Sequence, residues 1–229
     1  MSLDCTTPRY DALYARWLER PGDLLDLARY QPGDKLLDLC GGTGTLSRDA
    51  LRRGADPDTI TLLDRFPRAH GLHGIRVVRA DAEDVWKALG HEHRASFNVV
   101  ACRQAINYVD LERYGYRFFR DVSYLLAPNG RFVFNTFRRP KWSARTYTFR
   151  DRRYFEASGY FGRTVFHLQA TPGRDGGIDA SRFRWYPEAY LHERMPSNLY
   201  SDIHRTPATD RWVLTRVVDS HPHPDVSEW

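Results

Sequence analysis

Short apolar runs alternate along the chain with amphipathic stretches, and this alternation predicts a layered α/β fold. The predicted strands cover residues 35–39, 59–64, 75–81, 97–103 and 131–137. The predicted helices between them cover residues 45–54, 83–89 and 111–126. Strands that alternate with helices at this spacing form a parallel sheet with helices on both faces. The middle strands are apolar on both faces, as a buried parallel sheet requires, so we expect a doubly wound, mostly parallel sheet.

The alternation is absent from both ends of the chain. Residues 8–30 show helical spacing of aromatic residues and leucines, interrupted at Pro21-Gly22, which predicts a helical cap over residues 1–34. Residues 138–197 contain three short two-faced segments, which predict an antiparallel β insert. Those three predicted strands are 146–149, 164–170 and 180–186, with a glycine-rich turn at 173–177 between the second and the third.

The predicted architecture is a single domain. The last segment, residues 198–229, contains two strand patterns around a turn, which we interpret as a hairpin that completes a seven-stranded sheet, followed by a tail. Residues 35–137 form the core, and the insert follows the fifth strand of that core as a lid. A chain of 229 residues with 41% hydrophobic content is long enough to bury one full core.

Carboxylates follow three of the predicted strands at the edge where open α/β sheets bind ligands. Asp38 precedes a glycine-rich turn, Asp64 ends the second strand, and Asp81 ends the third. An acid at the position of Asp64, 20 residues beyond Gly44, is placed to bridge two ribose hydroxyls. Both nicotinamide dinucleotides and S-adenosylmethionine (SAM) fit that feature.

Asp38 distinguishes between these two cofactors. A nicotinamide cofactor places its pyrophosphate against the glycine turn, where a carboxylate would repel it. SAM has no phosphate and carries a sulfonium and an ammonium, so a nearby acid favours it. We therefore expect a SAM site at the glycine turn.

The motifs resemble those of class I SAM-dependent methyltransferases. LLDLCGGTG, TLLD, VVRADAED and FNVVACRQAINYV resemble the first to fourth motifs of that family, in order and at proper spacing. The resemblance covers residues 10–137 and the terminal hairpin. At Cys40-Gly41 the sequence departs from the usual order, in which a small residue comes first. The resemblance implies a Rossmann-like fold and SAM as cofactor.

The resemblance also implies roles for individual residues. In the family's terms Asp38, Gly42 and Gly44 shape the methionine end of the site, Asp64 binds the ribose, and Asp81 binds the adenine amine. The corner at Cys102-Arg103 faces the methionine amine. Tyr10 and Tyr14 either close the pocket or pack their helix on the sheet. The complete predicted cofactor set is Tyr10, Tyr14, Asp38, Cys40, Gly42, Gly44, Asp64, Arg65, Asp81, Ala82, Glu83, Cys102 and Arg103.

The catalytic candidates are Asn107, Tyr108 and His167. Methyl transfer from a sulfonium depends on positioning, so a recognisable triad is not required. An amine acceptor has only to be neutral, whereas a weakly acidic hydroxyl needs a base. Asn107 and Tyr108 follow the fourth strand and either hold the acceptor or serve as a helix cap and a packing residue. His167, on a predicted lid strand, is a candidate general base.

Basic and aromatic side chains gather in residues 138–163, where eight basic residues accompany two acidic ones. We predict that Tyr147, Arg150, Arg152 and Arg153 bind the substrate, because guanidinium forks and aromatic faces together hold an acidic or aromatic metabolite. Single-stranded RNA would also fit this composition. An amphipathic hairpin with solvated arginines is the third interpretation.

The resemblance favours a small-molecule acceptor, such as a natural-product intermediate. The fourth motif lacks the Asp/Asn-Pro-Pro-aromatic run of enzymes that methylate base amines in nucleic acids, and the sequence has no separate RNA-binding module. A nucleic-acid partner is therefore not expected. An RNA methyltransferase and a non-catalytic cofactor-binding protein of the same fold remain the alternatives.

Composition adds expectations about location and partners. The sequence shows no apolar run near the roughly 20 residues of a membrane helix and no signal peptide, so we expect a cytoplasmic protein. The three cysteines and nine histidines do not occur at metal-ligand spacing, so no metal is expected. The protein is expected to be a monomer or a homodimer.

Overall fold

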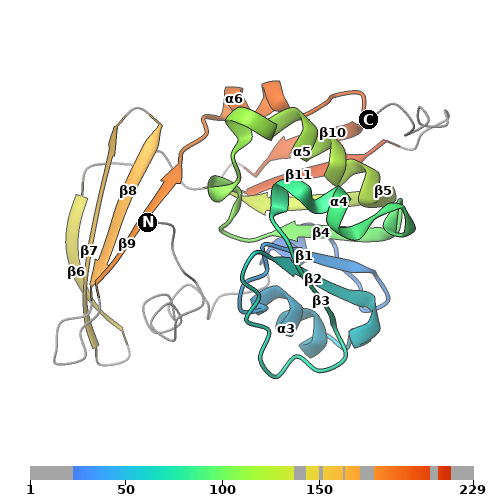
Figure 1. Cartoon of the computed structure of the whole chain (residues 1–229), viewed down its shortest axis with the longest axis horizontal. Coiled ribbons are helices and arrows are strands. Elements are labelled where there is room, and N and C mark those ends of the chain that lie inside the picture. The colour runs from blue at the N-terminus through green and yellow to red at the C-terminus, as the bar shows by residue number, and fades with distance from the viewer. Residues whose placement is uncertain are drawn as a thin grey trace.

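A computed structural model describes residues 23–136, 143–149, 152–161, 163–170, 178–206 and 211–217. In these parts of the chain, the strands form one sheet of seven and one sheet of four (Figure 1). The first helix that the pattern predicts before Pro21 and the predicted turn at 173–177 lie outside the described residues.

The larger sheet has five parallel strands and a terminal antiparallel pair, which confirms the predicted fold class. In spatial order its strands are β10 (Tyr200–Arg205), β11 (Arg211–Arg216), β5 (Leu126–Asn135), β4 (Phe97–Cys102), β1 (Leu36–Leu39), β2 (Ile60–Asp64) and β3 (Arg76–Arg79). Strand β11 runs antiparallel to β5, and β10 runs antiparallel to β11. The order changes direction at β1, between β4 and β2, which places the switch point at the end of β1.

Two apolar cores cover the two faces of this sheet. The helices are α2 (Asp23–Leu27), α3 (Thr45–Arg52), α4 (Val85–Leu89), α5 (Leu111–Leu125) and α6 (Glu188–Arg194). Alternate strand residues such as Leu36 and Val99 pack with α2 and α3 on one face. Their neighbours in the strands, such as Leu37 and Val100, pack with α4, α5 and α6 on the other face. Each central strand therefore buries both of its faces, which explains its continuous apolar sequence.

Strand β5 begins earlier than the sequence pattern predicts. The pattern places this strand at 131–137, after the turn-forming residues Pro128-Asn129-Gly130, but β5 starts at Leu126 and includes them. Asn129 has a left-handed φ of 62°, and the pairing of β5 with β4 shifts register between Phe97 and Val99. The turn residues therefore produce an irregularity in the strand rather than its start.

The insert is an antiparallel sheet of four strands, β6 (Ser143–Phe149), β7 (Arg152–Phe161), β8 (Thr164–Ala170) and β9 (Ile178–Arg184). It stands beside the larger sheet, and β9 leads back toward α6 (Figure 1). The prediction of three strands was wrong because it missed β7. Its sequence, RRYFEASGYF, mixes charged residues, aromatic residues and a glycine without a regular apolar alternation.

The described residues contain neither a membrane-spanning helix nor a metal-binding group of side chains. None of the helices there has the length and apolar composition needed to cross a membrane. In the same residues, no group of three or more His, Cys, Asp and Glu side chains is arranged to hold a metal ion.

Candidate active site

A cavity of about 480 Å³ lies at the carboxyl ends of β1, β2, β3 and β4, where the insert meets the larger sheet. Ten lining residues were predicted site residues: Cys40, Gly42, Asp64, Arg65, Asp81, Ala82, Glu83, Arg103, Asn107 and Tyr108. The prediction missed eight others, which are Phe66, Gln104, Ala105, Val109, Asp110, Thr164, Phe183 and Arg184. The structure therefore brings the ends of four strands and one end of the insert around a common space.

The glycine turn after β1 needs backbone conformations that few side chains allow. Gly42 and Gly44 have left-handed φ values of 51° and 77°, and Cys40 adopts a φ of 58°. Gly42 lines the cavity, whereas Gly44 begins α3 and packs against Leu72 so closely that a Cβ would overlap it. The turn thus presents bare backbone to a ligand on one side and packs tightly on the other.

Asp64 is held rigidly at the end of β2. Its Oδ2 accepts a hydrogen bond from the Gly42 N–H at 2.9 Å, and its Oδ1 accepts one from the Phe66 N–H at 2.7 Å. Burial raises the pKa of this carboxyl, and the two backbone donors oppose that rise. Each oxygen has a second lone pair, so the carboxylate can also accept two hydroxyl hydrogens from the cavity.

Asp81 pairs with the side chain of Arg65 at the cavity. Its Oδ1 accepts a hydrogen bond from Arg65 Nε. The side chains of Arg65 and Asp81 are 54% and 40% exposed. An adenine amine at Asp81 would therefore share the carboxylate with Arg65, a pairing that the sequence pattern did not indicate.

Asp38 is not among the residues that line the cavity, although the sequence pattern predicts that its charge favours the cofactor cation. Its side chain is buried, and its Oδ2 accepts hydrogen bonds from the Ser47 N–H at 3.0 Å and the Ser47 Oγ–H at 2.7 Å. Ser47 lies in the first turn of α3, where backbone N–H groups have no helical partner. Burial raises the pKa of Asp38 to about 6. The carboxylate thus anchors α3 to β1 behind the glycine turn.

The two strand-end cysteines lie on neighbouring strands. Cys40 lines the cavity, whereas Cys102 is fully buried and does not. The hydrogen bond with Cys102, together with burial, raises the pKa of the Cys40 thiol well above its usual range. The Cys40 thiol therefore stays protonated near neutral pH, and the buried Cys102 supports the site through packing.

Asn107 and Tyr108 join the cavity to the insert. Asn107 is fully buried, and its Nδ2 donates to the carbonyl oxygen of Arg184 at 2.5 Å. The Tyr108 side chain is 45% exposed, and its ring centroid lies 5.7 Å from that of Phe183. Asn107 therefore holds β9 against the larger sheet, while Tyr108 presents an aromatic surface to the cavity.

Of the four predicted substrate residues of the insert, Arg153 is the one whose side chain the structure describes. Arg153 is exposed on β7 and is not among the lining residues. Tyr10, Tyr14 and Arg150 and the side chains of Tyr147, Arg152 and His167 lie outside the described part of the structure. The insert instead contributes Thr164, Phe183 and Arg184.

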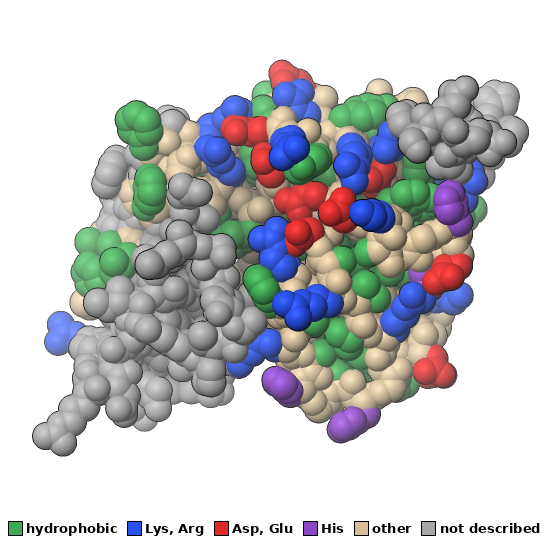
Figure 2. Space-filling view, in the orientation of Figure 1, with side chains coloured by type: hydrophobic (Ala, Val, Ile, Leu, Met, Phe, Trp, Pro, Cys, Tyr) green, Lys and Arg blue, Asp and Glu red, His purple; other side chains and the backbone are tan. Residues whose placement is uncertain are grey.

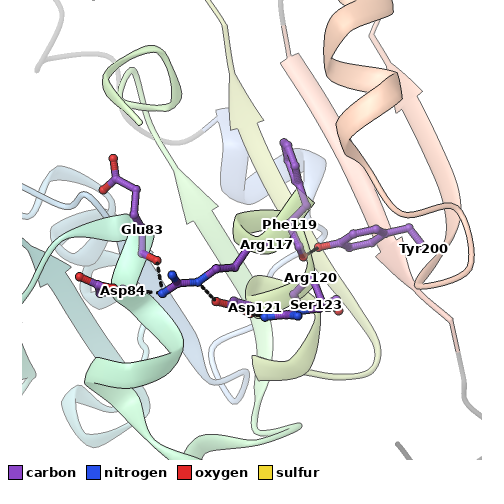
Figure 3. A network of polar contacts seen from close by, with 8 residues as sticks. All are labelled: Glu83, Asp84, Arg117, Phe119, Arg120, Asp121, Ser123 and Tyr200. Atoms are coloured by element: carbon purple, nitrogen blue, oxygen red, sulfur yellow. Dashed lines mark hydrogen bonds and ion pairs between the residues drawn. The ribbon is translucent and has the colours of Figure 1, made fainter. Parts of the chain in front are cut away.

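Helix α5 supports the acidic side of the cavity from behind. Arg117 reaches from α5 toward the chain segment of Glu83 and donates to the Glu83 carbonyl oxygen at 3.4 Å and to Asp84 Oδ1 at 3.1 Å (Figure 3). Its Nε also donates to the buried Asp121 at 3.4 Å. Glu83 Oε1 accepts the Asp110 N–H at 3.0 Å. Glu83 is therefore held at both its backbone carbonyl and its side chain.

Charges of both signs share the surface. Figure 2 shows acidic and basic side chains interleaved over the central and upper part of one face, around α5 and α6. A nucleic-acid backbone is usually bound by a continuous stripe of Lys and Arg. The described residues on this face do not form such a stripe.

The sheet order and a cavity at the switch point define a Rossmann-like fold of the class I SAM-dependent methyltransferase type. A family model described as a methyltransferase domain matches residues 9–172, so the chain belongs to that family. The enzyme class and SAM cofactor predicted from the sequence are thereby confirmed at the level of the family.

Solved structures of similar fold cover nearly the whole chain. A SAM-bound amino pentose methyltransferase of calicheamicin biosynthesis from Micromonospora echinaspora has a TM-score of 0.67 at 16% identity, covering 92% of this chain and 98% of its own. The CcbJ methyltransferase from Streptomyces caelestis also has a TM-score of 0.67 at 16% identity, with coverages of 90% and 94%. A sugar N-methyltransferase from Streptoalloteichus sp has a TM-score of 0.62 at 17% identity, with coverages of 90% and 87%. No curated protein sequence matches this chain.

Proposed function

We propose that this enzyme transfers a methyl group from SAM to a nitrogen or oxygen atom of a small molecule, such as a natural-product intermediate. The observation that carries the proposal is the cavity between the strand ends and the insert, which joins a cofactor end to an acceptor end. A small acceptor is also supported by the two enzymes of similar fold that are a sugar N-methyltransferase and an amino pentose methyltransferase.

The residues of the cofactor end fit SAM. Asp64, fixed by two backbone donors, is placed to accept the ribose hydroxyls. Gly42 allows close approach of backbone to the ligand, and Glu83 and Asp81 supply acceptors on the same side. SAM supplies an electrophilic methyl group on a cationic sulfur. The cavity carboxylates favour such a cation, whereas they would repel a pyrophosphate.

The acceptor end positions the nucleophile rather than activating it strongly. Tyr108 is the predicted catalytic residue that lines the cavity with a half-exposed side chain, so it is placed to contact the acceptor. An acceptor amine has only to lose its proton before it enters this space, and alignment with the methyl group then accounts for much of the rate.

The test is a methyl-transfer screen with purified enzyme. SAM is incubated with a panel of amines, phenols and amino sugars and, separately, with total RNA, and mass spectrometry follows both S-adenosylhomocysteine and a one-methyl mass increase. We expect turnover with at least one small molecule and none with RNA. Methylated RNA would support the alternative enzyme class, and cofactor binding without turnover on any acceptor would favour a non-catalytic protein.

A further inference from the structure

The guanidinium of Arg184 lies at the insert end of the cavity, and methyl transfer itself does not require it. Arg184 ends β9 and lines the cavity, and its side chain is 46% exposed. Its Nη1 donates to Thr164 Oγ1 at 2.8 Å across the β8–β9 pair. The guanidinium is therefore held at Nη1 by Thr164, while its side chain remains partly exposed at the cavity.

A carboxylate from the core also orients this guanidinium. Glu112, near the start of α5, has its Oε2 3.5 Å from Arg184 Nη2 and its Oε1 2.7 Å from Arg163 Nη2. Arg163 also lies over the Tyr190 ring, with its Cζ 4.6 Å from the ring centroid. One carboxylate is thus shared by two arginines, so the three side chains together carry one net positive charge.

The acids of the cavity are contributed by the core and already have partners there. Asp81 pairs with Arg65, and Asp64 and Glu83 accept backbone N–H groups. Asp110 accepts the backbone N–H of Arg113. The lining residues that the insert contributes are Thr164, Phe183 and Arg184, and these include no acid. The core side of the cavity therefore combines four acids with the arginines Arg65 and Arg103, whereas the described insert side presents Arg184 and no acid.

An aromatic surface lies beside the cation. The rings of Tyr108 and Phe183 are 5.7 Å apart and tilted by 57°, and both residues line the cavity. Phe183 precedes Arg184 in β9, so the aromatic pair and the guanidinium belong to the same edge of the insert. A ligand that spans this edge meets apolar ring faces and then a forked donor.

We propose that Arg184 binds an anionic group, a carboxylate or a phosphate, of the methyl acceptor, whose planar or apolar part lies against Tyr108 and Phe183. This inference rests on the proposed function and narrows its substrate to anionic acceptors. A guanidinium forms two parallel hydrogen bonds with either anion, which lysine cannot do. The assignment moves anion binding from the predicted arginines of β7 to the end of β9.

The test uses small probes in place of the unidentified acceptor. Benzoate, phenyl phosphate and the uncharged benzamide are titrated by ligand-observed NMR, with and without saturating S-adenosylhomocysteine, into the parent and into R184Q, R184K and R153Q. We expect benzoate or phenyl phosphate to bind at least about tenfold more tightly than benzamide to the parent. R184Q should remove this preference and leave benzamide binding unchanged, R184K should reduce it, and R153Q should keep it.

The titrations distinguish a carboxylate from a phosphate, and they test anion binding by Arg184 separately from the proposed methyl transfer. Preference for benzoate or for phenyl phosphate identifies the acceptor's anion. Equal binding of anionic and uncharged probes, absence of anion binding, an unaffected R184Q or an equal loss in R153Q would each overturn the assignment. Failure of S-adenosylhomocysteine to bind contradicts the proposed function alone, because the anion titrations without it are scored separately. Circular dichroism checks the fold of each variant.

Discussion

Asp38 shows how the same carboxylate can serve a different purpose from the one its sequence position suggests. It lies directly before the glycine turn, yet its Oδ2 accepts two hydrogen bonds from Ser47 in the first turn of α3. The residue is buried, and burial raises its pKa to about 6. Its role is to hold α3, and through it the glycine turn, in place.

The raised pKa of Asp38 predicts a specific pH dependence of stability. The folded state holds the Asp38 proton more tightly than the unfolded chain, whose aspartates titrate near pH 4. The resulting stabilisation is fully present below about pH 4 and is lost as the pH rises through about 6. Asp38→Asn cannot titrate, so the free energy of unfolding of the parent minus that of the variant should fall by on the order of 2 kcal/mol across this range. Urea unfolding at a series of pH values measures the difference, and two parallel curves would contradict the prediction.

The position of Asp38 also predicts how it affects cofactor binding. Because its carboxylate faces Ser47 and does not line the cavity, Asp38→Asn should weaken SAM and S-adenosylhomocysteine by the same factor. Calorimetric titration of both ligands into the variant measures the two losses. A loss confined to the cationic SAM would restore the direct electrostatic role that the sequence pattern suggested.

At the scale of elements, the insert is fastened to the larger sheet by a few buried polar contacts. Asn107 donates to the Arg184 carbonyl oxygen, and Tyr186 donates its hydroxyl hydrogen to the Val109 carbonyl oxygen at 2.7 Å. Tyr186 Oη also accepts the Leu111 N–H at 3.1 Å. These contacts join the segment between β4 and α5 to the end of β9, and so they determine where the acceptor end of the cavity lies.

Loss of the Asn107 amide should destabilise this junction. Asn107→Ala removes a fully buried donor and leaves the partly buried Arg184 carbonyl oxygen without it, which should lower the free energy of unfolding by about 1–3 kcal/mol. Asn98→Ala removes an exposed acceptor of the Lys35 N–H, which water can replace, and should therefore cost less. Urea unfolding compares the two variants. An Asn107→Ala loss no larger than that of Asn98→Ala would show that the tether is not important for stability.

The elements that the sequence pattern predicted are those with local signals. Strands β1, β2 and β4 are continuous apolar runs, and the α5 pattern extends over 15 residues, so each is recognisable alone. The pattern missed strand β7 because its sequence, RRYFEASGYF, gives no regular apolar alternation. The start of β5 was misplaced because Asn129 takes a turn-like φ inside a strand.

The candidate site was predictable to the extent that it depends on strand ends. Asp64, Gly42 and Asp81 follow from motif spacing, and all three line the cavity. The Arg65–Asp81 pair and the Asn107–Arg184 contact depend on side-chain packing, and the second joins residues 77 positions apart. A local pattern contains no information on such contacts. The RFRWY segment offered an aromatic and basic signal, but its position at the cavity follows only from the path of β9.

In the molecule as a whole, the two sheets contribute different kinds of residue to one cavity. The larger sheet contributes the acids and the glycine turn, and the smaller sheet contributes the aromatic and cationic edge. A cofactor bound at the strand ends would therefore lie within reach of an acceptor bound against the insert. We propose above all that Asp64, at the end of β2 beside the switch point, holds SAM.

The most direct test of that claim is a calorimetric titration of S-adenosylhomocysteine, in the presence of a chelator, into the parent, Asp64→Asn and the control Asp202→Asn. Asp202 is an exposed residue of β10 at the far edge of the larger sheet. We expect one site per chain in the parent and in Asp202→Asn. Asp64→Asn should lose about 1–3 kcal/mol of binding free energy, because it removes a charged acceptor from the ribose hydroxyls. No binding by the parent, or equal affinity in Asp64→Asn and the parent, would contradict the account.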